Sequence, residues 1–297
     1  MSRRGEGLLL LTVLVVIWGG NYTWVKVALA DMAPLTFNTL RYGAAAILMA
    51  LVAATRGSIR DSLPERDERL RLALIGVLQI GVVTACSTLA LRRIEATRVV
   101  LIIYSMPIWT LLLSAALFGE RASARTLAGV ALGAAGLALL TNPLAMAWTA
   151  DTLPGVLLAL ASVLGWAWGA LLYRARQWRS GLWSQVFWQI AVSVCFMIPF
   201  TLAFELGRPV NVTPALLATL FYNAIVPSVV GFWCWSQALA RVSVAHASQF
   251  LLLSPVFGLI QNNIVLGEPV GPATFVAAGC ILAGASLSLR TAPTPGA

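Results

Sequence analysis

The chain is built from apolar runs of about 20 residues, separated by short connectors that carry most of its arginines. A helix of that length, rising about 1.5 Å per residue, spans the ~30 Å hydrocarbon core of a bilayer. Lipid offers no partner to exposed backbone groups, and the runs lack the alternation typical of barrel strands. The sequence therefore predicts an all-α membrane protein with ten transmembrane helices, at residues 7–29, 33–55, 70–91, 96–118, 122–141, 153–174, 182–205, 213–239, 244–266 and 270–289.

The composition excludes an ordinary soluble domain. Hydrophobic residues make up 59% of the chain and charged residues 10%, whereas soluble domains carry roughly 25% charged residues. The net charge of +9 does not indicate nucleic-acid binding, because the basic residues flank apolar runs instead of forming one exposed patch. Each of the four cysteines lies in a different run without a CxxC pattern, so we predict no metal and no cofactor.

The distribution of basic residues predicts the orientation. The positive-inside rule places the arginine-rich connectors in the cytoplasm, and these include Arg56, Arg66 and Arg176. The opposite side would hold only Lys26, Arg92, Arg93, Arg98 and Arg208. We therefore expect a multi-pass protein of the bacterial inner membrane with both termini in the cytoplasm. A cleaved signal peptide is disfavoured, because the first apolar stretch is longer than the apolar region of a signal peptide.

The two halves of the chain resemble each other. A shift of 148 residues superimposes Arg93 on Arg241, Pro107 on Pro255, and Gly119-Glu120 on Gly267-Glu268, while a shift of 150 superimposes Trp18-Gly19 on Trp168-Gly169. We predict two five-helix repeats in one membrane domain, residues 1–145 and 146–297. Because five is odd, the second repeat enters the membrane from the opposite side. Such inverted repeats enclose the substrate site of many secondary transporters between their halves.

Several short motifs resemble a known family. The run Trp18-Gly19-Gly20-Asn21, then Lys26, Pro34-Leu35-Thr36-Phe37 and Arg41, resembles the start of EamA-type transporters in the drug/metabolite transporter superfamily. The two Pro and Gly-Glu pairs resemble the ends of their fourth and ninth spans. The resemblance covers nearly the whole chain and is nearest to the bacterial aromatic-amino-acid exporters. It implies ten helices around a central cavity, cytoplasmic termini, and export of amino acids or related metabolites.

The first two spans carry the clearest candidate site residues. Trp18, Tyr22 and Lys26 follow one helix face, where they either bind a substrate carboxylate and its body or face the lipid headgroups. Arg41, with Asn38 one turn before it, lies deep in the second span, where a charge needs an acceptor. That acceptor is either a substrate anion or the backbone of a neighbouring helix.

The ninth span carries polar residues on one face, which line a cavity or bond neighbouring helices. These residues are His246, Gln249 and Gln261. Trp109 is a further candidate, because the repeat relates it to Phe257 of the ninth span. Second-rank candidates lie in other spans: Gln79, Tyr104, Trp166, Trp188, Gln189, Tyr222, Asn223, Trp233 and Gln237. Four residues that soften or interrupt helices are candidate hinges or static bends: Gly19, Gly20, Pro107 and Pro255.

The ionisable residues limit the mechanism. No Asp or Glu lies in the middle of a predicted span, and no GxxxxGK[ST] motif for ATP is present. We therefore predict a facilitative or weakly coupled exporter of small metabolites by alternating access, with a small-molecule substrate and membrane lipid as its partners. A sugar-phosphate or nucleotide-sugar carrier and a multidrug exporter remain alternatives. An intramembrane enzyme is disfavoured, because His246 is the only histidine and no nucleophile motif accompanies it.

Overall fold

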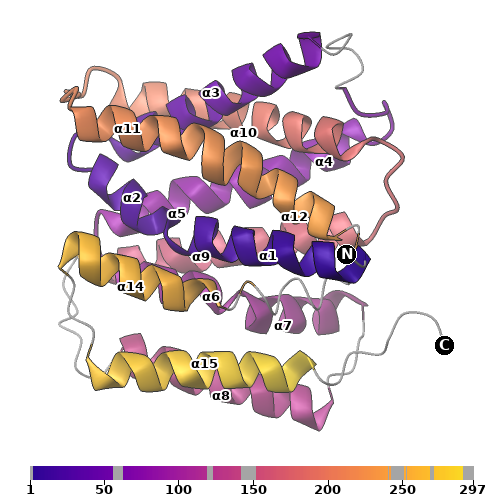
Figure 1. Cartoon of the computed structure of the whole chain (residues 1–297), viewed down its shortest axis with the longest axis vertical. Helices are drawn as coiled ribbons and strands as arrows, with labels where there is room; N and C mark the ends of the chain where they lie inside the picture. Colours follow the sequence, from indigo (N-terminus) through magenta and orange to yellow (C-terminus); the bar gives the residue numbers. More distant parts are fainter. Residues whose placement is uncertain are drawn as a thin grey trace.

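The computed structural model describes residues 3–55, 63–118, 123–141, 152–239, 241, 251, 253–267 and 271–289. Within these ranges the chain is helical and contains no strand, and its helices lie side by side in one bundle (Figure 1). Their bounds are α1 Arg3–Gly19, α2 Asn21–Ala28, α3 Pro34–Thr55, α4 Arg69–Gly76, η2 Val77–Val82, α5 Val83–Leu91, α6 Ala96–Tyr104, α7 Met106–Phe118, α8 Ala124–Thr141, α9 Thr152–Arg174, α10 Leu182–Glu205, α11 Pro214–Asn223, η3 Ala224–Val230, α12 Gly231–Leu239, α14 Ser254–Leu266 and α15 Pro272–Leu289.

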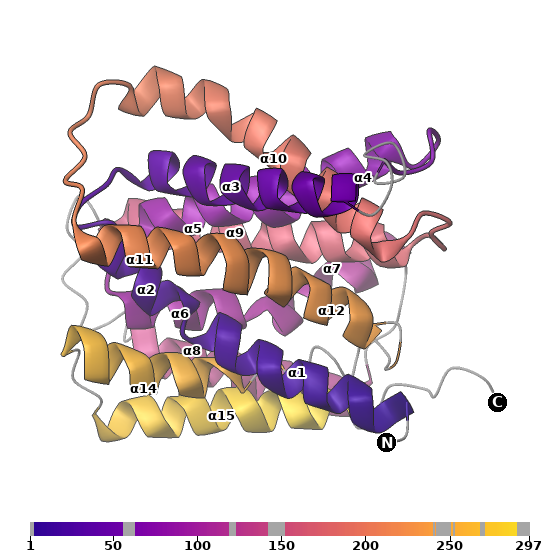
Figure 2. The same cartoon turned by 45° about the horizontal axis from the view of Figure 1, so that its top comes forward.

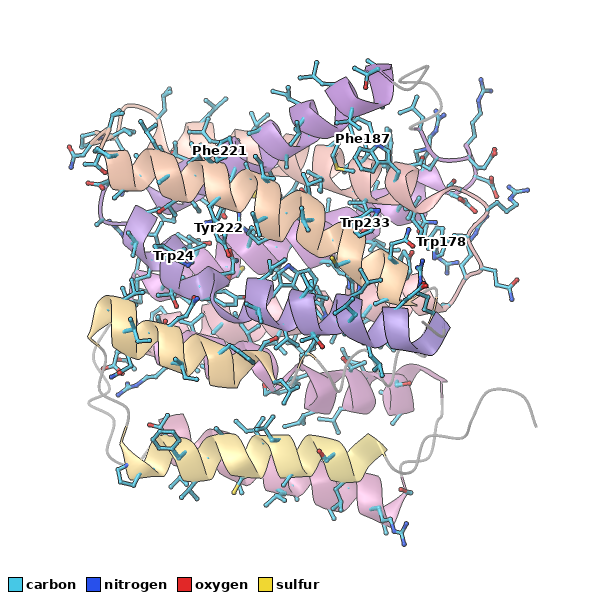
Figure 3. All side chains as sticks on the ribbon, in the orientation of Figure 1. Trp24, Trp178, Phe187, Phe221, Tyr222 and Trp233 are labelled. Carbon is cyan, nitrogen blue, oxygen red and sulfur yellow. The ribbon has the colours of Figure 1, made fainter. Side chains whose placement is uncertain are left out.

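Several helical stretches have the length and hydropathy of membrane spans. Among the described residues six qualify: Gly5–Ala28, Pro34–Thr55, Arg69–Leu91, Thr152–Tyr173, Leu182–Glu205 and Pro214–Trp235. Leu127–Gly136 and Pro272–Gly284 are shorter apolar stretches. Large apolar side chains cover the outside of the bundle, as Phe221 and Trp233 do on the outward face of α11 and α12 (Figure 3). A surface of this kind is suited to lipid, so the protein is a multi-pass membrane protein.

Helices related by the predicted repeat run antiparallel where they touch. Near the start of α3, the Thr39 hydroxyl shares a 2.8 Å hydrogen bond with that of Thr201, near the end of α10. The helices α8 and α15 lie together along one edge of the bundle (Figures 1 and 2), with Gly136 against Ala277 and Gly284 against Gly129. These close approaches use residues without bulky side chains, as membrane helix pairs commonly do.

The two halves are interleaved, because a helix of each half packs along the third span of the other. The helix α1 packs along α12, and α9 packs along α5 and η2. Glycines permit both approaches: a Cβ at Gly231 would lie 2.4 Å from the Trp18 indole nitrogen, and one at Gly165 would lie 3.0 Å from the Leu78 carbonyl oxygen. The interior is therefore shared between the halves rather than divided into two separate cores.

Both third spans contain a π-helical segment at the same place in the repeat. A shift of 148 moves residues 77–82, which form η2, onto residues 225–230, which lie within η3. A π turn inserts one extra residue and leaves backbone groups open to other partners. In η3 Pro227 also lacks an N–H, and the Ser228 hydroxyl instead donates to the Asn223 carbonyl oxygen at 2.7 Å.

Two predicted spans are interrupted near the middle of the bundle. The first breaks at Gly20, between α1 and α2, and the fourth breaks at Ser105, between α6 and α7. Pro107 is the second residue of α7, and Pro255 lies in the first turn of α14, where a missing N–H costs no helix bond. A Cβ at Gly19 would lie 2.6 Å from the Ser254 carbonyl oxygen, so the glycine permits close packing against α14.

Buried carboxylates tie both ends of α10 to the first half of the chain. At one end Glu205, at the end of α10, accepts hydrogen bonds from the backbone nitrogens of Leu35 and Thr36 at 3.1 and 2.7 Å. At the other end Glu68, which precedes α4, accepts from the backbone nitrogens of Arg179 and Ser180 at 2.8 and 3.1 Å, just before α10 begins. Each carboxylate thus meets the positive end of a helix from the other half.

The Glu68 contact predicts a pH-dependent stability. Burial alone would raise the pKa of Glu68, but the hydrogen bonds from Arg179 and Ser180 hold it below the ordinary value of 4.5. A lowered folded-state pKa stabilises the protein above pH 4.5, and this contribution is lost as the pH falls through the folded pKa. We expect Glu68→Gln to lower the melting temperature at pH 7 and to make it less sensitive to acid.

The measurement is thermal unfolding of the detergent-solubilised protein between pH 3.5 and 7. The Tm of the unmodified chain and that of Glu68→Gln should converge at the acid end. Parallel Tm profiles over the whole range would contradict the role assigned to this carboxylate.

Candidate functional site

A central cavity of about 90 Å³ lies between helices of both halves. This is several times the volume that one water molecule needs, about 10–15 Å³ on the same measure. From the first half it is lined by Trp18, Asn21, Tyr22, Val25, Arg41, Tyr42, Gln79, Val83, Thr84, Ser87, Thr88, Ile103 and Met106. From the second half it is lined by Ser162, Trp166, Pro227, Phe232 and Leu251.

One wall of the cavity is aromatic and is centred on Trp18. The Trp18 ring meets Trp166 edge to face at 5.7 Å between centroids, and meets Phe232 at 5.4 Å. Trp235 packs behind them, 6.1 Å from Trp18 and 6.5 Å from Trp166. The Trp18 indole N–H donates to the Pro227 carbonyl oxygen at 3.1 Å, so the ring is held in place by η3. Edge-to-face contacts of this kind stabilise a cluster beyond its buried area.

The polar part of the lining carries the Arg41 guanidinium. Arg41 is only 3% exposed, and its two terminal nitrogens donate to Asn223 Oδ1 at 2.9 Å and to the Tyr42 hydroxyl at 2.7 Å. The guanidinium also lies over the Tyr42 ring, 4.4 Å from its centroid. Its Nε is buried and has no hydrogen-bond partner. Among the described residues the cation is therefore held by neutral groups, with part of its donor capacity unused.

The rest of the polar wall is fixed by hydrogen bonds between helices. Asn38 of α3 donates to the Thr88 hydroxyl at 2.7 Å and to the Thr84 carbonyl oxygen at 3.2 Å. Ser162 of α9 donates to the Val83 carbonyl oxygen at 2.9 Å. The η2 segment presents Gln79 to the cavity, and the shift of 148 places Pro227 of η3 at the equivalent position. Both π-helical segments therefore contribute to the lining.

The two halves contribute different groups to the cavity, because some positions related by the shift of 148 carry different residues. The shift of 148 relates Trp18 to Trp166, and these two rings meet in the aromatic wall. The same shift relates Arg41 to Gln189, which is buried in α10 and is not part of the lining. The positive charge of the cavity therefore comes from the first half alone, as far as the described lining residues extend.

The structure brings four of the predicted site residues together. Trp18, Tyr22, Arg41 and Gln79 line the central cavity, and Asn38 is bonded to its lining. Other candidates lie elsewhere among the described residues. Lys26 lies further along α2 and does not line the cavity, and Trp109 of α7 donates to the Ser105 hydroxyl at 3.1 Å. Of the three residues that share this helix face, Trp18 and Tyr22 therefore line the cavity and Lys26 does not.

The remaining candidates have other surroundings or lie outside the described residues. Tyr222 packs against Trp24 of α2, with ring centroids 6.2 Å apart (Figure 3). Gln261 lies against Gly20, and its Oε1 is buried without a partner. His246 and Gln249 lie outside the described residues, as do the side chains of Tyr104, Pro107 and Pro255.

Sequence reasoning missed several lining residues that periodicity does not single out. Asn21 belongs to the motif at the start of the chain, but nothing in its spacing indicates the pathway; its Oδ1 is buried in the lining without a partner. Tyr42 follows Arg41 directly in the sequence, and its contact with the guanidinium depends on the conformation of the Arg41 side chain. Phe232 lines the cavity where its repeat counterpart is Thr84. Trp166, by contrast, was a second-rank candidate, and the shift of 148 also relates it to Trp18.

Gly231 permits the position of the Trp18 ring, so a side chain there should disturb the aromatic wall. A Cβ at this position would lie 2.4 Å from the indole nitrogen. We expect Gly231→Ala to break the bond to Pro227 and to lower the free energy of unfolding by about 1–3 kcal/mol. Tryptophan fluorescence and thermal unfolding measure this effect.

Gly279→Ala is the matched control for Gly231→Ala. It lies in α15 with no atom near the added Cβ, and it should leave both signals unchanged or slightly raise the stability. Equal behaviour of the two variants would contradict the steric argument.

A multi-pass helical protein with an amphipathic cavity between two interleaved halves has the construction of a membrane transporter. The chain belongs to the EamA-like transporter family, whose model matches residues 5–142 and again residues 153–290. The family assigns the chain to transporters rather than to enzymes.

Curated relatives agree with this assignment, and a solved structure shares the fold. An uncharacterized transporter of Archaeoglobus fulgidus is 28% identical over 96% of each chain. A protein of Escherichia coli K12 named "Probable amino-acid metabolite efflux pump" is 27% identical, over 96% of this chain and 94% of its own. The inner membrane transporter YedA of Escherichia coli K12 is 26% identical over 92% of this chain and 87% of its own. One crystal structure shares the fold, with a TM-score of 0.72, 18% identity, and coverage of 95% of this chain and 96% of that one.

Proposed function

We propose that this protein exports small metabolites, including amino acids with aromatic side chains, by alternating access. The observation that carries the proposal is the central cavity, which combines a buried cation with an aromatic wall and is lined by both halves. An amino acid has a carboxylate for Arg41 and a side chain that fits beside Trp18 and Trp166. The relative named as an amino-acid metabolite efflux pump supports this substrate class.

The proposal includes a ten-helix architecture of two inverted five-helix repeats. The described helices follow the ranges predicted for the spans, and the π-helical segments lie 148 residues apart. The antiparallel pairs α3 with α10 and α8 with α15 support opposite orientations of the repeats. Two units related in this way have two similar arrangements, each open to one side of the membrane.

The orientation that we propose places the beginning of α1 in the cytoplasm of a bacterial cell, at the inner membrane. The beginning of α1 and the end of α15 lie at the same end of the bundle (Figure 1). Described arginines lie at that end, among them Arg69, Arg176 and Arg179, and the positive-inside rule favours a cytoplasmic position for them.

The helix breaks beside the cavity are the proposed hinges. The break at Gly20 lies between Trp18 and Tyr22, so a change of angle there moves two lining residues relative to each other. Pro107 and Pro255 occupy equivalent positions after the shift of 148, in the first turns of α7 and α14. By contrast Glu205 ties the end of α10 to the start of α3, and Glu68 ties the segment before α4 to the start of α10. We therefore propose that α3, α4 and α10 stay together during the transition.

The charges of the cavity favour weak ion coupling and argue against two alternatives. Among the described lining residues Arg41 is the one charged group, so the lining as described provides no carboxylate for a proton or a cationic drug. A sugar-phosphate or nucleotide-sugar carrier would be expected to pair two cations on its substrate, and Lys26 is not in the described lining. Both alternatives are therefore less well supported than amino-acid export.

Transport assays with purified protein in liposomes test the proposal. Labelled phenylalanine, tryptophan or threonine should enter protein-containing vesicles faster than empty ones, and unlabelled amino acids should compete. We expect flux down a concentration gradient without ATP or an imposed ion gradient. If none of these amino acids crosses faster than in empty vesicles, the proposed function is wrong.

A further inference from the structure

We propose that the central cavity binds its ligand through a carboxylate and does not require an ammonium group. The ligand class is thus a carboxylic acid with an apolar or aromatic body, and an amine of the same shape is excluded. The inference deepens the proposed transport function and rests on it for its physiological meaning. Its physical basis is the state of Arg41 and the placement of the described carboxylates.

Arg41 is a buried cation whose charge the described residues leave uncompensated. The two hydrogen bonds it makes go to an amide oxygen and a phenol, and its Nε has no partner. A buried charge without a counter-charge costs several kcal/mol in order of magnitude, and in a membrane such a residue usually marks a ligand site. A guanidinium with free N–H groups matches the two oxygens of a carboxylate.

The described carboxylates are engaged away from the cavity. Asp31 accepts from the Thr213 hydroxyl at 2.7 Å, Glu6 pairs with Arg241 at 3.3 Å, and Glu95 pairs with Arg98 at 3.4 Å. Glu68 and Glu205 bind the helix beginnings described above, Asp67 pairs with Arg176 and Arg179, and Glu65 is exposed in the segment before α4. The negative charge for Arg41 is therefore absent from this part of the chain, and a bound ligand is the natural source.

The described lining provides no charged partner for an ammonium group. No Asp or Glu belongs to the described lining, and the acceptors there are neutral groups such as the Asn21 amide oxygen, which has no partner. An ammonium close to Arg41 would also meet the like charge of the guanidinium. An amino acid is tolerated because its carboxylate offsets this repulsion, whereas an amine without a carboxylate gains nothing from Arg41.

The aromatic wall requires that the anion carry an apolar body. Trp18, Trp166 and Phe232 line the same cavity as Arg41 and Asn21. An inorganic anion or acetate would satisfy Arg41 but leave these rings without a partner. A ligand that places its charge on Arg41 and its ring on this wall buries both parts.

Four small molecules that differ in charge and in the presence of a ring test the inference. Their binding to the purified protein in detergent is measured by ligand-induced thermal stabilisation and by quenching of tryptophan fluorescence. They are 3-phenylpropionate, L-phenylalanine, 2-phenylethylamine and acetate. We expect the first two to bind, with 2-phenylethylamine and acetate at least tenfold weaker. The proposal would be overturned if 2-phenylethylamine bound as tightly as 3-phenylpropionate. It would also be overturned if neither 3-phenylpropionate nor L-phenylalanine bound. If acetate bound as tightly as 3-phenylpropionate, the cavity would be a simple anion site, and the requirement for an apolar body would be overturned.

Two variants assign the effect to Arg41. Arg41→Met should abolish binding of 3-phenylpropionate, while Arg208→Met removes an exposed cation outside the cavity lining and should retain it. Because Arg41→Met risks misfolding, Asn223→Asp provides a second test. The new carboxylate lies where Asn223 Oδ1 now accepts from Arg41, so it should compete with the ligand and weaken acid binding at least tenfold, without lowering Tm. Unchanged acid binding in Asn223→Asp would overturn the inference.

The same proteins in liposomes separate the inference from the proposed function. Acid-selective binding without any flux of phenylalanine would refute transport and leave the ligand site intact. Phenylalanine flux that is unchanged in Asn223→Asp would refute the role of Arg41 and leave transport intact.

Discussion

Replacing Glu205 by alanine is expected to lower the free energy of unfolding by about 3 kcal/mol, because it leaves buried donors at the start of α3 unpaired. Glu205 is 6% exposed and accepts three hydrogen bonds, from the backbone nitrogens of Leu35 and Thr36 and from the Thr36 hydroxyl. Its negative charge also lies at the positive end of the α3 dipole. Unfolding by heat or by SDS in mixed micelles measures the loss.

Two further variants control for the removal of charge at Glu205. Glu205→Gln keeps the shape and one acceptor oxygen, so it should lose roughly half of the effect of the alanine variant. Glu95→Ala removes a carboxylate that is 64% exposed and paired only with Arg98, and it should cost about 0.5 kcal/mol or less. If Glu205→Ala is no less stable than Glu95→Ala, the tie between α3 and α10 does not contribute to stability.

The second large effect is expected in transport. Replacing Trp166 by alanine should lower kcat/KM for an aromatic amino acid about tenfold or more, since ring contacts contribute about 0.5–1.5 kcal/mol beyond the buried area. Trp166 faces the cavity and meets Trp18 at 5.7 Å between ring centroids. Threonine has no ring, so its transport should change much less. Initial rates of labelled phenylalanine and threonine entry into liposomes measure the difference.

Trp168 provides the matched control for this experiment. It lies two residues further along α9, is 42% exposed and does not line the cavity. Trp168→Ala should therefore transport phenylalanine like the unmodified protein. Equal losses in Trp166→Ala and Trp168→Ala would show that general damage to α9, rather than the aromatic wall, causes the effect.

The sequence predicted the helical membrane fold and the family. These follow from local properties: the length of an apolar run, the arginines that flank it and short motifs in a set order. The sequence also selected Trp18, Tyr22, Arg41 and Gln79, which the structure places around one cavity. Polar and aromatic residues inside a span must find partners in the interior, so their presence in an apolar run is itself informative.

The tertiary structure decided which of these residues meet. The sequence aligned Trp18 with Trp168, but in the bundle Trp18 meets Trp166, because successive residues of a helix are turned by about 100° and two positions apart point to different sides. Lys26 shares a helix face with Trp18, yet it lies beyond the cavity along α2. Arg41 required an acceptor on any reading of the sequence. Only the packing of α3 against η3 and the end of α11 provides it with Asn223, 182 residues away, and leaves its Nε without a partner.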